Sequence, residues 1–170
     1  MKFTLVDRIV EFVPGERIVA LKAVSLAEEY LADHFPTFPV LPGVLILEAM
    51  VEAARWMVWQ TQGFAHSMIL LSEAKNVTYK TFVAPGQTLR VEVTVRRLAQ
   101  RESEFAGAGY REGTEVVKAR FALAHWNLAD KSPELAALDR QLVEQARSRW
   151  SLLAGEGAGN TPAATARSDG

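Results

Sequence analysis

The chain has 170 residues, of which 49% are hydrophobic and 23% are charged, and its formal net charge is −1. This length and hydrophobic content fit one globular domain with a substantial core, and the balanced charge does not point to nucleic acid or an anionic membrane. Cysteine is absent, which excludes disulfides, a thiol nucleophile and cysteine metal ligands. The N-terminus lacks the apolar stretch of a signal peptide, and no apolar run is long enough for a confident membrane span, so we expect a cytoplasmic protein.

The first predicted elements are two strands within residues 4–24, separated by a turn at Pro14-Gly15-Glu16. Residues 25–42 are expected to be irregular, because three of the seven prolines of the chain fall there. A helix is predicted from about Pro42-Gly43 to about Gln60. It is apolar on almost every side and should therefore be central and buried.

Three polar residues interrupt this helix. Glu48, Glu52 and Arg55 are spaced i, i+4 and i+7, which places them on one stripe. A carboxylate on an apolar helix is costly to bury unless it has a partner or a chemical task. Glu48 is therefore a candidate functional residue.

The next part of the chain predicts further strands at residues 68–83, where the strand can bend, at 89–95, and in a hairpin formed by 103–111 and 115–126. One long buried helix wrapped by five or more antiparallel strands is an α+β arrangement. We expect residues 1–130 to form this domain.

A second helix is expected at the C-terminal side of the domain. Ser132 is the predicted N-cap and Pro133 the first helical residue, and the element should occupy about 131–153. Its predicted apolar stripe consists of Leu135, Leu138, Leu142, Ala146 and Trp150. Residues 154–170 are rich in Gly, Ala, Ser and Thr and predict a flexible tail.

One run joins the irregular segment to the long helix. It contains His34-Phe35, Pro39-Val40 and Pro42-Gly43, and Glu48 follows on the helix. Histidine titrates near neutral pH and suits proton transfer, while a helix N-terminus can bind a negatively charged oxygen. The combination predicts a proton-abstraction site.

The residues of this run, with Glu48-Ala49-Met50, are similar in register to the motif of the β-hydroxyacyl-acyl-carrier-protein dehydratases, which have the hot-dog fold. The likeness extends to about residue 127. It implies a lyase of fatty-acid biosynthesis, or of a related pathway of lipid metabolism, that converts (3R)-3-hydroxyacyl thioesters on acyl carrier protein into trans-2-enoyl thioesters. Glutamate at position 48, where the isomerising branch has aspartate, implies dehydration alone.

The resemblance also implies roles for individual residues. His34 would remove the C2 proton, the Gly43 amide would polarise the thioester carbonyl, and Glu48 would help protonate or position the departing hydroxyl. The Val40 carbonyl would orient the histidine. No metal or redox cofactor is implied, since the substrate arrives on the phosphopantetheine arm of the carrier. Each site would be shared by the two chains of a homodimer, and a trimer of dimers is left open.

Two positions depart from the motif. Thr37 stands where the family usually has glycine, which implies a different local backbone or a narrower mouth. Glu52, counted with the substrate-binding residues, stands where the family has a glutamine that donates to the acid, and an ionised glutamate cannot donate. Either the two carboxylates raise the pKa of one of them, or Arg55 pairs with Glu52 and leaves Glu48 undisturbed, or the site is degenerate.

Two other functions fit parts of the pattern. A hot-dog thioesterase also places an acid on the central helix, and an inactive hot-dog subunit would bind an acyl carrier or serve in assembly. Arg96, Arg97 and Arg101 form either a docking patch for an acidic carrier or a set of solvated strand-end charges.

The remaining candidates are aromatic residues and histidines. Trp56, Met57 and Trp59 would either line an acyl tunnel or, more simply, belong to the core. His66 and His125 are assigned to structure or solvent.

Overall fold

A computed structural model describes residues 4–155 of the chain. Its strands are β1 (Arg8–Val13), β2 (Arg17–Ala23), β3 (Met68–Tyr79), β4 (Thr88–Leu98), β5 (Glu102–Arg111) and β6 (Thr114–Trp126). Its helices are α1 (Tyr30–Asp33), α2 (Gly43–Thr61) and α3 (Ala136–Ala154), with 3₁₀ turns at Leu128–Asp130 and Pro133–Leu135. No helix in this part of the chain is long and apolar enough to cross a membrane.

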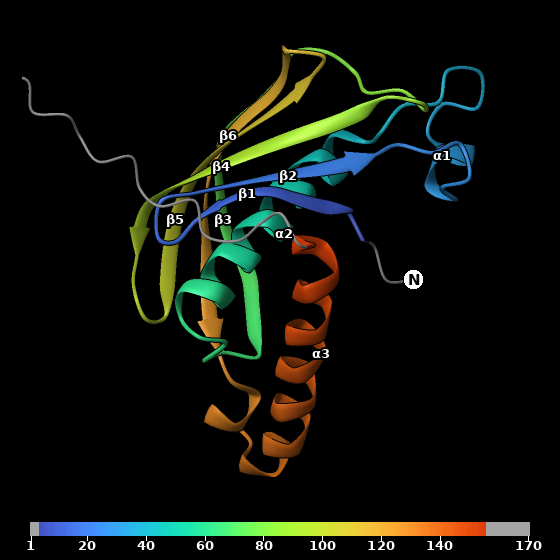
Figure 1. The fold of residues 1–170 in the computed structure, drawn as a ribbon. Coiled ribbons are helices and arrows are strands. Elements are labelled where there is room, and N and C mark those ends of the chain that lie inside the picture. The colour runs from blue at the N-terminus through green and yellow to red at the C-terminus, as the bar shows by residue number, and fades with distance from the viewer. Residues whose placement is uncertain (1–3, 156–170) are drawn as a thin grey trace, which may run out of the picture.

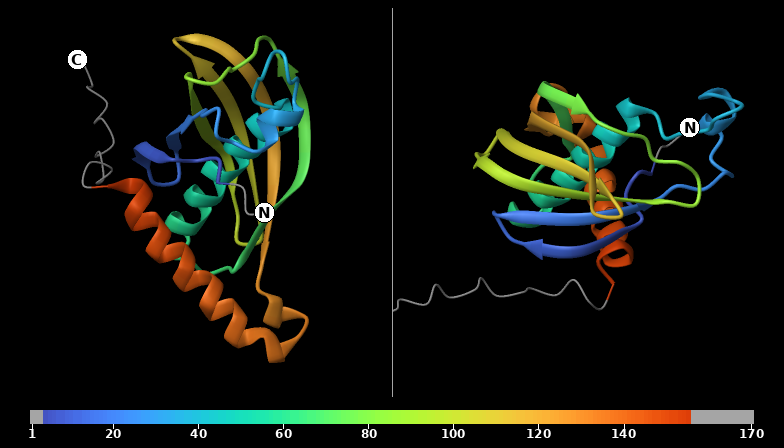
Figure 2. Two further views of the ribbon diagram at one scale, coloured as in Figure 1. Left: turned by 90° about the vertical axis from the view of Figure 1, so that its right-hand side faces the viewer. Right: turned by 90° about the horizontal axis from the view of Figure 1, so that it is seen from above.

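The strands form one six-stranded sheet in the order β1-β2-β4-β5-β6-β3, with all neighbours antiparallel. The sheet curls around α2, which lies against its concave face (Figures 1 and 2). The apolar side chains of the strands and of α2 form a single core between them. This arrangement confirms the predicted α+β hot-dog fold. The proposed tail from residue 156 onward lies outside the described residues.

The central helix is held very close to the sheet. A Cβ atom added to Gly107 on β5 would lie 2.8 Å from the Met50 sulfur of α2, so the methionine side chain would have to move. The helix begins at Gly43 as predicted, and Gly63 follows its end with a left-handed φ of 62°. The polar stripe of α2 is therefore carried by a fixed element.

Strand β3 lies at one edge of the sheet, beyond β6. Its pairing with β6 shifts register between Leu71 and Glu73 and again between Lys75 and Thr78, which accounts for the predicted bend. Most of its side chains are exposed, including Leu70 and Leu71. The strand ends at Tyr79, four residues before the predicted limit.

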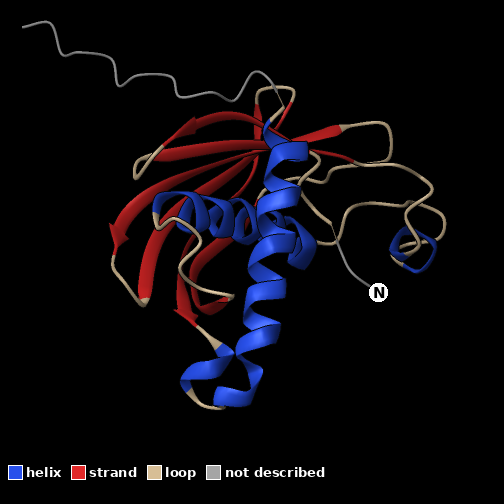
Figure 3. Cartoon of the chain, turned by 60° about the horizontal axis from the view of Figure 1, so that its bottom comes forward, coloured by secondary structure: helices blue, strands red, loops and turns tan. Residues whose placement is uncertain are grey.

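The other edge strand, β1, is covered by α3. Figure 3 shows α3 crossing the side of α2 that the sheet leaves open. The Trp150 ring meets Phe12 of β1 edge-on, with centroids 5.2 Å apart, and also contacts Trp56 of α2 at 6.0 Å. The C-terminal helix is thus part of the packed domain.

The start of this helix differs from the prediction. Ser132 makes no side-chain capping bond, and Pro133 opens a 3₁₀ turn that precedes the α-helix. Asp139 ties the junction together instead, because its carboxylate accepts the Leu128 and Ala129 amides, both at 2.9 Å, and the Ser67 hydroxyl. The predicted apolar stripe is also wrong at Leu138, which is 40% exposed.

Candidate active site

His34 lies in a loop that closes on itself. The ring Nδ1 is 3.0 Å from the Val40 carbonyl oxygen, and the Val40 amide donates back to the His34 carbonyl at 3.4 Å. A carbonyl only accepts hydrogen bonds, so Nδ1 carries the hydrogen and the neutral ring keeps a lone pair on Nε2. The Val40 carbonyl therefore orients the ring and leaves Nε2 for another partner, and Val40 stands where the resemblance implies an orienting carbonyl.

The backbone of this loop is strained at Phe35 rather than at Thr37. Phe35 has a φ of 32°, a left-handed value that is uncommon for a bulky residue. The Phe38 amide donates to the Phe35 carbonyl at 2.9 Å. Thr37 replaces the glycine of the motif without itself adopting a left-handed φ, so this departure leaves the loop closed.

Gly43 begins α2 beside this loop. The amides of a first helical turn have no partner inside the helix and form its positive end. A Cβ atom on Gly43 would lie 3.0 Å from a ring carbon of Tyr79 on β3. Glycine therefore lets the helix start approach β3 closely, and the Leu45 and Ile46 amides behind it already bond to the Pro42 carbonyl.

Large exposed apolar side chains surround the loop and the helix start. This apolar rim consists of Phe35, Phe38, Val44, Tyr79 and Phe82. The Phe38 and Phe82 rings meet edge-on at 6.0 Å. Exposed apolar residues gathered in one place mark a surface that binds a ligand or another chain.

Glu48 lies farther along α2, and Arg55 is its partner. The Arg55 guanidinium donates to Oε1 of Glu48. Of the alternatives left open for Glu52, pairing with Arg55 that leaves Glu48 undisturbed is therefore not the one found. Glu52 and Glu48 lie three and seven residues before Arg55, so both are on its helix face. The hydrogen bond is made to Glu48.

Glu52 is buried and is held by the N-terminal segment. Its Oε2 accepts the backbone amide of Leu5 at 2.7 Å. Burial raises the pKa of the Glu52 carboxyl, while the Leu5 amide and the charges of Arg55 and Arg149 oppose the shift. The charge of Glu48 is the smallest of the causes that act on this pKa. A carboxyl with a raised pKa is thus present, as one of the alternatives predicted, but the main cause is burial and not the neighbouring Glu48.

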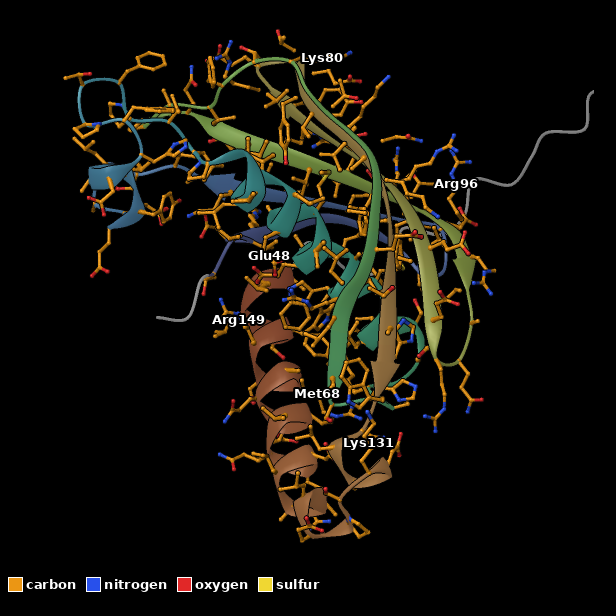
Figure 4. The ribbon with its side chains drawn as sticks, turned by 180° about the vertical axis from the view of Figure 1, so that it is seen from behind. Glu48, Met68, Lys80, Arg96, Lys131 and Arg149 are labelled. Atoms are coloured by element: carbon orange, nitrogen blue, oxygen red, sulfur yellow. The ribbon has the colours of Figure 1, made fainter. Side chains whose placement is uncertain are left out.

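Within residues 4–155 of one chain, no hydrogen bond joins His34 to Glu48; His34 is held by Val40 and Glu48 by Arg55. Glu48 stands five residues beyond Gly43, about 7–8 Å along the helix axis. In Figure 4 it lies at the level of the last turns of α3, where Arg149 also lies. One chain therefore carries both halves of the predicted site, each held by a different partner.

A cavity of about 170 Å³ lies between α2 and α3, and the sequence did not predict it. Trp56, Trp59, Arg55 and Arg149 are among its lining residues. Trp56 and Met57 are buried, and the Trp59 indole donates to the His66 carbonyl at 2.8 Å. The simpler assignment of these aromatic residues to the core fits these contacts.

Two of the three arginines of the candidate docking patch are neutralised. Arg97 pairs with Glu102 and Glu104, and Arg101 pairs with Asp130. These pairs favour the reading of the patch as solvated strand-end charges.

The two remaining histidines are buried next to each other. The ring centroids of His66 and His125 are 5.7 Å apart, and both rings bond to the Gln100 carbonyl. They are structural, and neither is exposed to solvent.

Comparison with known proteins identifies the family. A model of the FabA-like domain matches residues 1–120. The chain belongs to the FabA-like domain family. Relatives in this family include the 3-hydroxyacyl-[acyl-carrier-protein] dehydratase FabZ of Pelotomaculum thermopropionicum, 39% identical over 108 residues, which span 64% of this chain and 77% of the relative. The FabZ of Solibacter usitatus is 37% identical over 130 residues, 76% of this chain and 78% of the relative.

Solved structures show the same fold at lower identity. The dehydratase heterocomplex ApeI:P from Xenorhabdus doucetiae contains a chain with a TM-score of 0.62 and 17% identity, over 78% of this chain and 90% of that one. A homologue of HP0420 from Helicobacter felis gives a TM-score of 0.55 and 16% identity, over 72% and 79% of the two chains. The matched family region ends within β6, so the end of that strand, the 3₁₀ turns and α3 lie beyond it.

Proposed function

We propose that the protein dehydrates (3R)-3-hydroxyacyl thioesters on acyl carrier protein to trans-2-enoyl thioesters, in fatty-acid or related acyl-chain biosynthesis. The observation that carries the proposal is the bond between Nδ1 of His34 and the Val40 carbonyl, which leaves Nε2 free as a base beside the start of α2. Family membership and FabZ relatives of 37–39% identity support the same reaction.

The proposed reaction begins at C2 of the substrate. His34 Nε2 takes the C2 proton, and the electron pair of that bond moves toward the thioester carbonyl. The Gly43 amide, at the positive end of α2, stabilises the developing negative oxygen. The C3–oxygen bond then breaks as the double bond forms, and Glu48 positions or protonates the departing hydroxyl, which leaves as water.

We propose that two chains complete each site, with His34 from one chain and Glu48 from the other. The absence of a hydrogen bond between these residues in the described part of one chain supports this arrangement. The free edge of β3, with Leu70 and Leu71 exposed, and the apolar rim supply surface for a homodimer. A trimer of dimers is compatible with the same contacts.

The proposal needs neither a metal nor a redox cofactor, because proton transfer and charge stabilisation are assigned to His34, Gly43 and Glu48. The phosphopantetheine arm belongs to the substrate carrier. The proposal also places the protein in the cytoplasm, a compartment that suits a chain without cysteine.

The test is to incubate the protein with a 3-hydroxyacyl carrier protein, and separately with the enoyl form, and to follow the acyl mass. Loss of one water, abolished by His34→Ala and retained by Asp33→Ala on the neighbouring position, is the expected result. Release of free acid would instead assign a thioesterase. No turnover at several chain lengths would leave an inactive subunit that binds or assembles.

A further inference from the structure

Arg55 is the side chain that contacts the Glu48 carboxylate. Its Nη2 donates to Oε1 of Glu48 from two turns farther along α2. The residue one turn after Glu48 is Glu52, whose Oε2 accepts the Leu5 amide, and no hydrogen bond joins Glu52 to Glu48 within the described residues. The donor to Glu48 therefore comes from Arg55.

The pair is shielded enough for its geometry to matter. The side chain of Arg55 is 22% exposed and that of Glu48 is 36% exposed. Hydrogen bonds between charged groups are shorter and stronger than neutral ones, and partial burial strengthens them further. A guanidinium stays charged over the pH range in which enzymes work. Arg55 therefore remains a hydrogen-bond donor to Glu48 over that range.

Within the described residues Arg55 forms its ion pair with Glu48, and Arg149 forms none with Arg55 or Glu48. Glu48 and Glu52 lie on the same helix as Arg55, and the charges of Arg55 and Arg149 both act on Glu52. Arg149 reaches this position from α3 and donates to the Thr4 hydroxyl at 2.7 Å. The order Glu48, Arg55, Glu52, Arg149 places each charge beside one of opposite sign.

We propose that Arg55 is a positioning residue that holds Glu48 as an oriented carboxylate during dehydration, an inference that rests on the function proposed above. A carboxylate in this state accepts a hydrogen bond from the C3 hydroxyl and directs that group as it leaves. The proton that completes the water is then the one that His34 removed from C2. One C–H and one C–O bond break, one C=C bond and one O–H bond form, and His34 returns to its neutral state.

The central experiment compares Arg55→Met with Arg55→Lys. Methionine keeps an unbranched chain without the charge, and lysine keeps a cation. With a 3-hydroxyacyl carrier protein, we expect Arg55→Met to lower kcat by about tenfold or more, as loss of a hydrogen bond between charged groups does. KM should change by less than about twofold, because the contact acts on the reacting atoms and not on carrier binding. Arg55→Lys should recover part of kcat.

Two further variants separate positioning from general stability. Arg149→Met makes the same exchange at the neighbouring cation, which does not touch Glu48, and kcat should stay within about twofold of the wild type. Adding Glu52→Gln to Arg55→Met places an amide donor one turn from Glu48 and should restore part of kcat. If Arg55→Met leaves kcat unchanged, or if Arg149→Met lowers it equally, the proposal is overturned.

A measurement without substrate tests the contact itself. A double-mutant cycle of Glu48→Gln and Arg55→Met on the free energy of unfolding should be non-additive, because each change removes the same bond. Additive effects would overturn the proposal whatever the activity. If the wild type converts no carrier substrate, the proposed function fails and the positioning role fails with it, whereas a non-additive cycle would still establish the pair.

Discussion

Glu52 shows how a single substitution changes the surroundings of the predicted site. The Glu52 carboxylate accepts a hydrogen bond from the Leu5 amide, and this bond attaches the N-terminal segment to α2. Burial raises the pKa of the same carboxyl. A raised folded-state pKa means that the native state binds a proton more readily than the unfolded chain does. The ionised form therefore costs stability, and the protein gains stability as the pH falls through that raised pKa.

This reasoning predicts the behaviour of Glu52→Gln. The amide oxygen of glutamine can still accept the Leu5 amide, but there is no charge to bury. We expect the free energy of unfolding near neutral pH to be no lower than in the wild type. The wild type should gain stability between neutral pH and about pH 4.5, the ordinary range of a glutamate, and this gain should be absent from the variant. Chemical denaturation at several pH values measures both quantities.

The control at this position is Glu52→Ala, which removes the acceptor and leaves the Leu5 amide buried without a partner. It should lose about 1–3 kcal/mol of stability. Equal free energies of unfolding for the alanine and glutamine variants would show that the hydrogen bond to Leu5 does not contribute to stability.

Among the elements, the junction between β6 and α3 depends on a residue inside the helix. Asp139 accepts two backbone amides of the turn at Leu128–Asp130 and the hydroxyl of Ser67. Burial alone would raise the pKa of the Asp139 carboxyl, but these three donors together lower it below its ordinary value. The carboxylate thus joins the end of β6, the start of β3 and α3.

We expect Asp139→Ala to lower the free energy of unfolding by about 2–3 kcal/mol at neutral pH. Because the folded-state pKa is lowered, this contribution is present above the unfolded pKa near 4 and is lost as the pH falls through the folded value. Ser132→Ala is the matched control, since Ser132 caps nothing and its loss should change little. Thermal unfolding of both variants at pH 7 and below pH 4 tests the pair.

The elements also show where sequence reasoning reaches its limit. The long helix and the β5–β6 hairpin were predicted correctly because their signals are local, namely a Pro-Gly start, an apolar run and a glycine turn. The start of α3 was predicted wrongly because no side chain caps it. The junction before it is held instead by Asp139, which accepts the hydroxyl of Ser67, 72 residues away in the sequence. The partner of Arg55 stayed open in the sequence because both carboxylates lie on its face of α2, and only the fold shows that Leu5 engages Glu52.

At the scale of the whole molecule, the two edges of the sheet differ. β1 is covered by α3, whereas β3 presents exposed side chains along most of its length. An uncovered edge strand next to an apolar rim is a surface on which a second copy of the chain can pair. Pairing of two chains can also bring His34 of one chain to Glu48 of the other, which are not hydrogen-bonded within the described residues of one chain.

Mixing two inactive variants tests this arrangement. His34→Ala and Glu48→Gln should each lack activity as homodimers. When they are unfolded together and refolded, half of the dimers should be mixed, and each mixed dimer should hold one site with both residues intact. If each site takes His34 from one chain and Glu48 from the other, activity should return to about a quarter of the wild-type level, as statistical pairing requires. Sites completed within a single chain would give no recovery, because every chain in the mixture then carries a defect in its own site.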